Sequence, residues 1–167
     1  MSEEKKNEPL VENSEEKTYE LSRVLRFILV SSFILLNITY SADVGVIYDP
    51  IYASVSDRTN CAYSAYGISF DKYTGSRGKA GGSDANAEFI GKLRELLERH
   101  NIQYQFAELG RVDVGGGGTI AYILANKGVE VIDCGVPVLS MHSPYEVASK
   151  YDIYSAYKTY KIFYEEI

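Results

Sequence analysis

The part of the chain that follows residue 40 alternates short apolar stretches with helical patterns, and this alternation constrains the fold more than any other feature. The most regular pattern covers residues 84–100, where an apolar face lies opposite a charged one. Its apolar positions are Phe89, Ile90, Leu93, Leu96 and Leu97. Three shorter stretches are typical of strands, namely residues 63–73, 102–109 and 129–132. We therefore expect a sheet with helices packed on its faces.

Two further helices are predicted towards the C-terminus. The last one is expected to begin at Ser143, because Ser143–Glu146 combines a capping serine, a proline at the first helical position and a glutamate that completes a capping box. This helix is expected to run to the C-terminus, with an apolar stripe made of Val147, Tyr151, Tyr154, Tyr157, Ile162 and Phe163. A shorter helix is predicted from Thr119 to about Asn126, with Gly128 as its stop signal.

Glycine-rich or irregular segments separate these elements and are predicted to be loops. They cover residues 74–83, 115–118 and 133–141. Residues 115–118 are four consecutive glycines, which allow close backbone approach, and free N–H groups at the following helix start attract negative charge. A plain flexible turn explains the same four glycines. The segment matches neither the phosphate-binding lysine loop nor the dinucleotide fingerprint.

The first 40 residues differ in character from the rest. Residues 1–22 are predicted to be a disordered acidic tail, because seven glutamates fall between Glu3 and Glu20 with few apolar residues among them. Residues 23–40 form an apolar segment. Its apolar run Phe27–Tyr40 has 14 residues, which is short for a membrane span of about 20 residues. The acidic stretch before it is unlike the basic start of a signal peptide. A buried helix or strand is favoured, and a membrane anchor and a signal peptide remain as alternatives.

Length and composition are those of a soluble globular domain, with 167 residues of which 46% are hydrophobic and 24% charged. The net charge of −6 comes without a basic stripe, which argues against a nucleic-acid partner. Cys61 and Cys134 fit no zinc or redox spacing. They are predicted to be buried thiols in a reducing compartment, which indicates a cytoplasmic location.

Only two histidines are available as metal ligands. His100 ends a charged helix, where an imidazolium complements the helix dipole, so it is predicted to be a surface cap. His142 follows an apolar run and precedes a predicted helix start, a position from which loops present functional groups. Asp43 lies in the sequence Ser-Ala-Asp-Val, where a helix cap or turn role is favoured by position alone. Spacing alone leaves a structural and a functional role open for both His142 and Asp43.

Four longer strings, taken together, resemble a known family. They are SADV, KYTGSRGKAGGSDANAEF, ELGRVDVGGGGTIA and DCGVPVLSMHSPYEV, beginning at residues 41, 72, 108 and 133. In this order and at these distances they closely resemble the aspartyl aminopeptidase and vacuolar aminopeptidase I family of zinc metallopeptidases. The resemblance covers residues 41–167. It implies the C-terminal part of a metallo-aminopeptidase catalytic domain, with an α/β fold that forms part of a three-layer α/β/α sandwich.

The resemblance implies roles for five residues. Asp43 and His142 each match a terminal ligand of one of two adjacent zinc ions, which together activate a bridging water and polarise the substrate carbonyl. Lys72 matches a position that meets the acidic side chain of a peptide substrate. Gly117 and Gly118 belong to a loop that lines the pocket near the scissile peptide bond.

The family pattern also contains groups that this chain lacks. A first histidine, a bridging aspartate, a glutamate ligand and a catalytic glutamate precede the Ser-Ala-Asp motif in the family, whereas an acidic tail and an apolar segment precede it here. No catalytic residue is therefore assigned. We expect a truncated or split aminopeptidase that releases N-terminal residues, with acidic ones as candidates, and that forms a homo-oligomer or binds a partner supplying the missing half. The alternatives are a catalytically incomplete module for assembly or partner binding, and a membrane-tethered protein.

Overall fold

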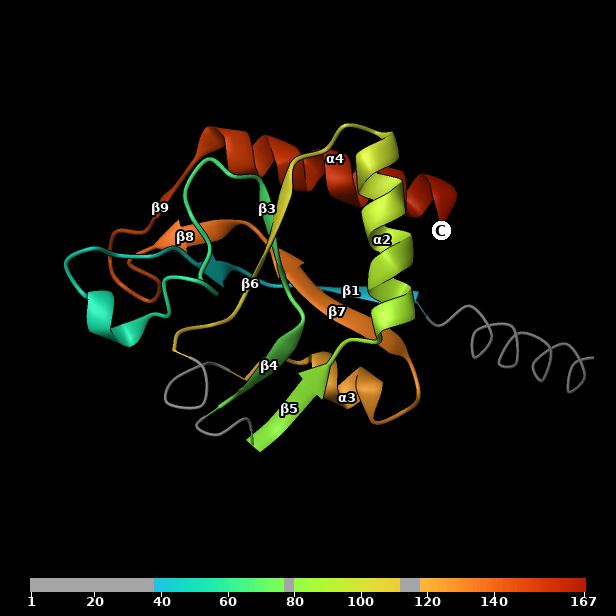
Figure 1. Ribbon diagram of the computed structural model, residues 1–167, viewed down its shortest axis with the longest axis horizontal. Helices are drawn as coiled ribbons and strands as arrows, with labels where there is room; N and C mark the ends of the chain where they lie inside the picture. The colour runs from blue at the N-terminus through green and yellow to red at the C-terminus, as the bar shows by residue number, and fades with distance from the viewer. Residues whose placement is uncertain (1–37, 77–79, 112–117) are drawn as a thin grey trace, which may run out of the picture. The chain divides into compact units, whose positions relative to one another are not determined.

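The computed structural model describes residues 38–76, 80–111 and 118–167. In chain order the elements are β1 (Ile38–Ala42), β2 (Gly45–Val46), the 3-10 helix η1 (Ala53–Val55), β3 (Ile68–Asp71), β4 (Tyr73–Ser76), β5 (Ala80–Asp84), α2 (Ala87–Arg99), β6 (Tyr104–Ala107), α3 (Ala121–Ala125), β7 (Glu130–Gly135), β8 (Pro137–Leu139), β9 (Val147–Ala148) and α4 (Lys150–Glu166). Figure 1 shows their arrangement. This mixture of strands and helices confirms the predicted α/β class.

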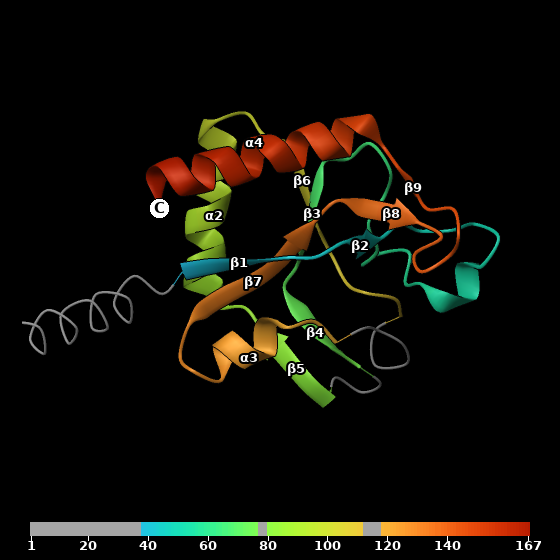
Figure 2. The same ribbon diagram turned by 180° about the vertical axis from the view of Figure 1, so that it is seen from behind.

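The central sheet has four strands in the order β1-β7-β3-β6. β1 is parallel to β7 and β6 is parallel to β3, whereas β3 and β7 are antiparallel. A three-stranded sheet in the order β2-β8-β9 and the two-stranded hairpin β4-β5 accompany it, and Figure 2 shows both from behind. The central sheet is therefore mixed, with antiparallel pairing at its middle.

Two segments of chain run side by side through both larger sheets. β1 and then β2 follow β7 and then β8 in parallel register. Between the strands, the N–H of Asp43 donates to the carbonyl of Cys134 (3.2 Å) and the N–H of Gly45 donates to the carbonyl of Val136 (3.1 Å). The two segments are thus hydrogen-bonded without interruption, and Asp43 lies in the middle of their pairing.

One face of the central sheet packs against α2 and α4. Ile68 and Phe70 of β3 and Ile132 of β7 are almost fully buried there. The helix residues in the same core are Phe89, Leu93, Leu96, Leu97, Ala156, Ile162 and Phe163. Removing such hydrocarbon surface from water stabilises the fold by about 25 cal/mol for each Å². The predicted apolar face of helix 84–100 is confirmed.

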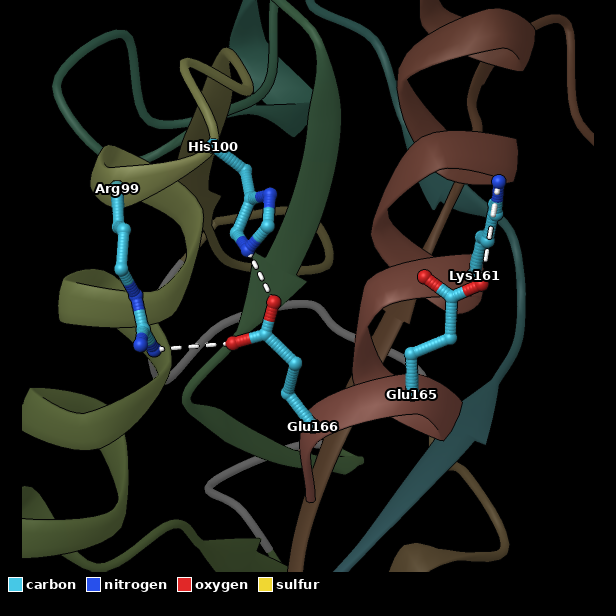
Figure 3. Close-up of polar contacts among 5 residues, drawn as sticks. All are labelled: Arg99, His100, Lys161, Glu165 and Glu166. Carbon is cyan, nitrogen blue, oxygen red and sulfur yellow. Dashed lines mark hydrogen bonds and ion pairs between the residues drawn. The ribbon is translucent and has the colours of Figure 1, made fainter.

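A side chain caps the start of α2, and the backbone N–H of His100 caps its end. The side-chain oxygen Oδ1 of Asn86 accepts the N–H of Glu88 (2.9 Å), and His100 follows the last helical residue as the C-cap. The Nε2 atom of His100 contacts one carboxylate oxygen of Glu166 on α4, and Arg99 contacts the other oxygen at 3.3 Å (Figure 3). The prediction that His100 is a cap is confirmed, and Glu166 joins the C-terminal ends of the two helices.

Helix α4 begins later than the sequence pattern predicts. Its N-cap is Ser149, whose hydroxyl accepts the N–H of Tyr151 (3.1 Å). The predicted start at Ser143 is wrong for two reasons. The carboxylate of Glu146 accepts the N–H of His142 rather than closing a capping box, and the next two residues pair with β8 as strand β9.

The buried face of α4 also differs from the predicted aromatic stripe. Tyr151, Tyr154 and Tyr157 are 45%, 59% and 61% exposed, although Ile162 and Phe163 are buried as expected. The other buried positions of the helix are small or polar, namely Asp152, Ser155, Ala156 and Thr159. These positions follow the spacing of one helix face, so α4 does have a buried stripe. A search for apolar periodicity does not find it, because several of its residues are polar or small.

The polar residues of this stripe anchor the turn that precedes β3. Asp152 is fully buried, and its two carboxylate oxygens accept the N–H groups of Ala65 (2.9 Å) and Gly67 (2.8 Å). Ala65 and Gly67 have positive φ angles of 66° and 91°, so a regular strand cannot pass through them. The strand predicted over residues 63–73 is therefore confined to β3, which begins at Ile68.

The opposite face of the central sheet carries polar side chains and is covered by α3 and the β4-β5 hairpin (Figures 1 and 2). Strand register places Ser41, Asp133 and Asp71 in one row on this face. Ala121 of α3 is buried, and Thr119 just before that helix contacts both Thr74 of the hairpin and Asp133 of β7. The sheet lies between two covering layers, as a three-layer α/β fold requires.

Two segments predicted as loops contain strands. Residues 74–83 lie mostly in the β4-β5 hairpin, which has a register shift between Thr74 and Ser76, and residues 133–141 contain the end of β7 and all of β8. These strands pair through backbone groups, so a composition rich in glycine does not prevent their formation. Side-chain periodicity gives little sign of them.

The N-terminal predictions fall largely outside the described residues. The tail at residues 1–22 and most of the apolar segment at residues 23–40 belong to this part, and only Ile38–Tyr40 are described, as the start of β1. In the described part of the chain, no helix has both the length and the apolar character needed to cross a membrane.

Candidate metal and substrate site

Asp43 lies where the chain passes from the central sheet into the smaller one. Its backbone is held by the hydrogen bond to Cys134, and its Oδ1 atom accepts the N–H of Val44 (2.8 Å). The residue is exposed. The carboxylate is thus fixed at its base and open to solvent, which is the arrangement expected of a ligand that a rigid strand presents.

Gly135 on β7 makes this arrangement possible. A Cβ atom added to Gly135 would lie 1.4 Å from the carbonyl oxygen of Asp43 and 2.5 Å from its carbonyl carbon. Any larger residue at position 135 would therefore push the Asp43 backbone away. Asp43 can therefore hold its position only because residue 135 is a glycine.

His142 lies in a turn after β8 that has an unusual backbone. Its φ angle is 68° and that of Ser140 is 60°, in a region that residues other than glycine rarely occupy. The N–H of His142 donates to the carboxylate of Glu146 (2.6 Å), and the N–H of Ser143 donates to the carbonyl of Ser140 (3.0 Å). These bonds brace an exposed histidine in a strained turn, and such strain is concentrated at functional positions.

Asp43 and His142 belong to the two chain segments that run in parallel, Asp43 after β1 and His142 three residues after β8. Carboxylate and imidazole are donor types that zinc accepts. Within residues 38–76, 80–111 and 118–167, however, no three His, Cys, Asp or Glu side chains come together as a metal site. The described part supplies two suitable donors without a complete donor set, and their role as ligands stays a prediction.

Lys72 lies at the base of the β4-β5 hairpin. Its Nζ atom forms an ion pair with the Oδ1 atom of Asp84, and its carbonyl accepts the N–H of Ala85 (2.8 Å). The Lys72 and Asp84 side chains are 46% and 61% exposed, so water screens this pair. Lys72 therefore has a carboxylate partner already, and an acidic ligand would have to compete with Asp84 for it.

The glycine segment is described only at its end. Gly117 lies outside the described residues, whereas Gly118 is exposed and a Cβ atom added to it would meet nothing within 4 Å. The next residue, Thr119, is buried, and its hydroxyl donates to the Oδ2 atom of Asp133 (2.5 Å). The chain thus changes within one residue from an open glycine to a threonine tied to the central sheet.

Asp133 is 2% exposed, and this burial raises the pKa of its carboxyl above the usual range. The hydroxyls of Ser41, Thr119 and Thr74 oppose the shift, and the charge of Asp43 adds to it. The pKa of Asp133 therefore depends on Ser41 and Asp43 on one side and on Thr119, which follows the glycines, on the other.

A cavity of about 250 Å³ lies elsewhere, beside the junction of β1 with the C-terminal ends of α2 and α4. Its lining consists of Ile38, Phe89, Lys92, Glu95, Leu96, Arg99, Glu166 and Ile167. None of the predicted site residues is among them. The cavity is thus separate from the chemistry discussed above.

A family model described as aminopeptidase I zinc metalloprotease (M18) matches residues 8–164. The chain belongs to this family. The match spans most of the chain, and it confirms the resemblance carried by the four strings that begin at residues 41, 72, 108 and 133.

Individual M18 proteins agree with this assignment. A probable M18 family aminopeptidase 1 of Clostridium acetobutylicum is 54% identical over 123 residues, which are 74% of this chain and 26% of that protein. The crystal structure of aminopeptidase I from the same organism has a TM-score of 0.71, with 74% of this chain and 27% of that chain covered. An M18 aminopeptidase from Thermotoga maritima has a TM-score of 0.74 at 42% identity, with 78% and 29% covered. The fold is therefore that of part of an M18 aminopeptidase.

The chain spans about a quarter of the length of the curated relatives it matches. M18 members are hydrolytic metalloenzymes, so the matched segment comes from a peptidase family. The activity, substrate and partners of this protein are therefore matters for proposal.

Three residues near the predicted site were missed by the sequence analysis. Asp133 is a buried carboxylate within an apolar strand, Gly135 permits the approach of Asp43, and Glu146 braces His142. For Asp133 a signal did exist, since a lone acidic residue inside the run Val-Ile-Asp-Cys-Gly-Val is unexpected in a buried strand unless it is paired.

Proposed function

We propose that this chain supplies part of the catalytic domain of a zinc aminopeptidase, and that it contributes one terminal ligand to each of two zinc ions. The observation that carries the proposal is the M18 match over residues 8–164, which contains Asp43 and His142 within two of the matching strings. Both residues are exposed and both have a braced backbone.

The two ligands would use the atoms that the fold leaves open. The Val44 N–H bond to Oδ1 orients the exposed Asp43 carboxylate, which would provide the ligand oxygen. The bond from the backbone N–H of His142 to Glu146 holds the turn in place. The side chain of His142 is exposed, and its imidazole ring would bind the metal through one of its nitrogens. Zinc bound there would supply Lewis-acid chemistry that polarises a carbonyl and lowers the pKa of a bound water.

The remaining donors and the general base would come from outside the described residues. Two donors hold zinc weakly, because a site that closes around the ion needs three or four protein ligands. The described part alone is therefore proposed to be inactive. Activity would require further polypeptide, which a partner could provide.

For the substrate we propose a peptide with an acidic N-terminal residue. The support is Lys72, whose ammonium group already binds the Asp84 carboxylate and so is suited to binding another. Because the pair is exposed, replacing Asp84 by a substrate carboxylate would cost little.

A cytoplasmic location is proposed on the basis of the two cysteines. Cys61 and Cys134 are buried free thiols rather than a disulfide, as expected in a reducing compartment.

A chimeric enzyme tests the catalytic proposal. Residues 41–167 of this chain would replace the matching quarter of the Clostridium acetobutylicum relative, and turnover of aspartyl and leucyl fluorogenic amides would be measured together with zinc content. We expect an active chimera that prefers the aspartyl amide. Asp43→Asn and His142→Gln should each lower kcat/KM by at least about 100-fold and reduce bound zinc, because a direct ligand matters at least as much as the groups that orient it.

The matched control for this test is His100→Gln. It changes the other histidine of the chain, which caps a helix and contacts Glu166. This variant should keep full zinc content and turnover. A folded chimera that binds two zinc ions yet turns over neither amide would refute the catalytic proposal, as would full activity of both ligand variants.

A second candidate function is partner binding without catalysis, favoured by the exposed tyrosines of α4. Tyr154 and Tyr157 stack at 6.4 Å between ring centroids, and Tyr164 near the C-terminal end of the helix is 85% exposed. Aromatic residues of this kind are enriched at protein interfaces. Replacing Tyr154 and Tyr157 with serine should abolish self-association or capture of a partner if this candidate is right, and should leave chimera turnover unchanged.

A further inference from the structure

Asp133 occupies the centre of the polar face of the sheet. On β7 it pairs in register with Ser41 of β1 on one side and with Asp71 of β3 on the other. Burial of a carboxyl group at such a place is costly unless polar neighbours compensate it. The neighbour whose hydrogen bond to Asp133 is well formed is Thr119, at 2.5 Å from Oδ2.

Thr119 is the first residue after the glycine segment whose side chain is buried. A Cβ atom added to Gly118 before it would meet nothing within 4 Å, and Ile120 after it is 67% exposed, so Thr119 is the buried residue of this stretch. The Thr119 hydroxyl also lies 3.4 Å from the hydroxyl of Thr74 on the β4-β5 hairpin. One buried hydroxyl thus meets the central sheet and the hairpin.

The same stretch of β7 also seats Asp43. Gly135, two residues after Asp133, lies directly against the Asp43 backbone, and the carbonyl of Cys134 between them accepts the Asp43 N–H. Consecutive residues of one strand therefore contact the candidate metal ligand and the residue that follows the glycine segment.

We propose that Asp133 is a positioning residue, which holds Thr119 and thereby sets the end of the glycine segment against the strand that seats Asp43. The inference rests on the proposed function for its significance, because Gly118 matters only if a peptide lies beside it. It adds a specific physical link, namely one buried hydrogen bond that joins the substrate side of the site to the metal side.

Hydrogen exchange of the full chain tests this link without zinc or substrate. The variant Thr119→Val removes the hydroxyl at nearly constant volume, and Thr119→Ser restores it. The amide to follow is that of Ile123, which donates to the carbonyl of Ile120 (3.0 Å) in α3. Exchange at Ile123 should become roughly ten- to hundredfold faster in Thr119→Val, the range set by losing a hydrogen bond to a carboxylate, to which loss of the weaker Ala121 N–H bond to the same hydroxyl (3.4 Å) adds. The rate should return to that of the wild type in Thr119→Ser.

The amide of Asp43 provides the internal reference, since it is bonded to the backbone carbonyl of Cys134 and not to the Thr119 hydroxyl. Its exchange should change by less than about threefold in Thr119→Val if the bond acts as a local tether rather than as general support. A matched control removes another buried hydroxyl: Ser155→Ala deletes the bond to the carbonyl of Gln103 (2.6 Å) and should leave Ile123 unaffected relative to Asp43.

Two results would overturn the inference. One is unchanged exchange at Ile123 in Thr119→Val. The other is an equal acceleration at Ile123 and Asp43, which would mean that the bond supports the whole sheet. Neither result depends on peptidase activity. An inactive chimera would therefore count against the proposed function and leave the Asp133–Thr119 link intact. Unchanged exchange at Ile123 would count against the link and leave the proposed function intact.

Discussion

Gly135→Ala should destabilise the protein strongly although it adds a single methyl group. The added Cβ would lie 1.4 Å from the Asp43 carbonyl oxygen, whereas unstrained contacts between such atoms are about 3.5 Å, so the two strands would have to separate by about 2 Å. Such a displacement stretches the hydrogen bonds from Asp43 to Cys134 and from Gly45 to Val136. Overpacking costs about 1–3 kcal/mol and each lost bond about 1 kcal/mol, which gives a loss of about 3–5 kcal/mol.

Gly91→Ala is the matched control for this prediction. Gly91 lies on the exposed side of α2, and a Cβ atom added there meets nothing within 4 Å. The same substitution should therefore stabilise the protein by about 0.5–1 kcal/mol through helix propensity. Urea unfolding followed by tyrosine fluorescence is a suitable assay, because the chain has 15 tyrosines and no tryptophan. If Gly135→Ala unfolded at the same urea concentration as Gly91→Ala, the close approach of Asp43 to β7 would be refuted.

Three further changes test the core, the anchored turn and the buried carboxyl. Leu97→Ala should lower the free energy of unfolding by about 2–5 kcal/mol in urea titrations, because Leu97 is fully buried between α2 and the sheet, and a loss below 1 kcal/mol would contradict that burial. Asp152→Asn should cost about 1.5–3 kcal/mol in the same assay, because an amide cannot accept the N–H groups of both Ala65 and Gly67, and a neutral result would show the turn to be held otherwise. The raised pKa of Asp133 means that the folded state binds its proton more tightly than the unfolded state, so this residue's contribution is fully present below the unfolded pKa and is lost as pH rises through the folded one. Asp133→Asn should therefore gain stability relative to wild type as pH rises above the unfolded carboxyl pKa of about 4, and a difference independent of pH would refute the shift.

The main helix and the core could be predicted from the sequence because their signals are local and apolar. The spacing of Phe89, Leu93 and Leu97 is sufficient to identify the buried face of α2. His100 could be assigned as a cap for a similar reason, since a charged helix end and a histidine are adjacent in the chain.

The start of α4 could not be predicted, because the sequence offers two serine caps and only tertiary contacts choose between them. Ser143 with Pro144 is the stronger local signal. Glu146 is instead recruited by the strained turn at His142, and the strand β9 takes the residues before Ser149. The hairpin β4-β5 was missed for a related reason, since backbone pairing rather than side-chain pattern forms it.

The two faces of the central sheet differ in what a substitution there can reveal. On the face covered by α2 and α4, hydrocarbon packing dominates, and such packing tolerates volume-conserving change with small losses. On the opposite face, Asp133 and Thr119 share a directional hydrogen bond in a buried setting, so removing one partner leaves the other unsatisfied. Changes on the first face should therefore alter stability alone. Changes on the second should also move the segment that carries Gly118. The polar face rather than the apolar core is therefore the place to look for residues that adjust the candidate site without belonging to it.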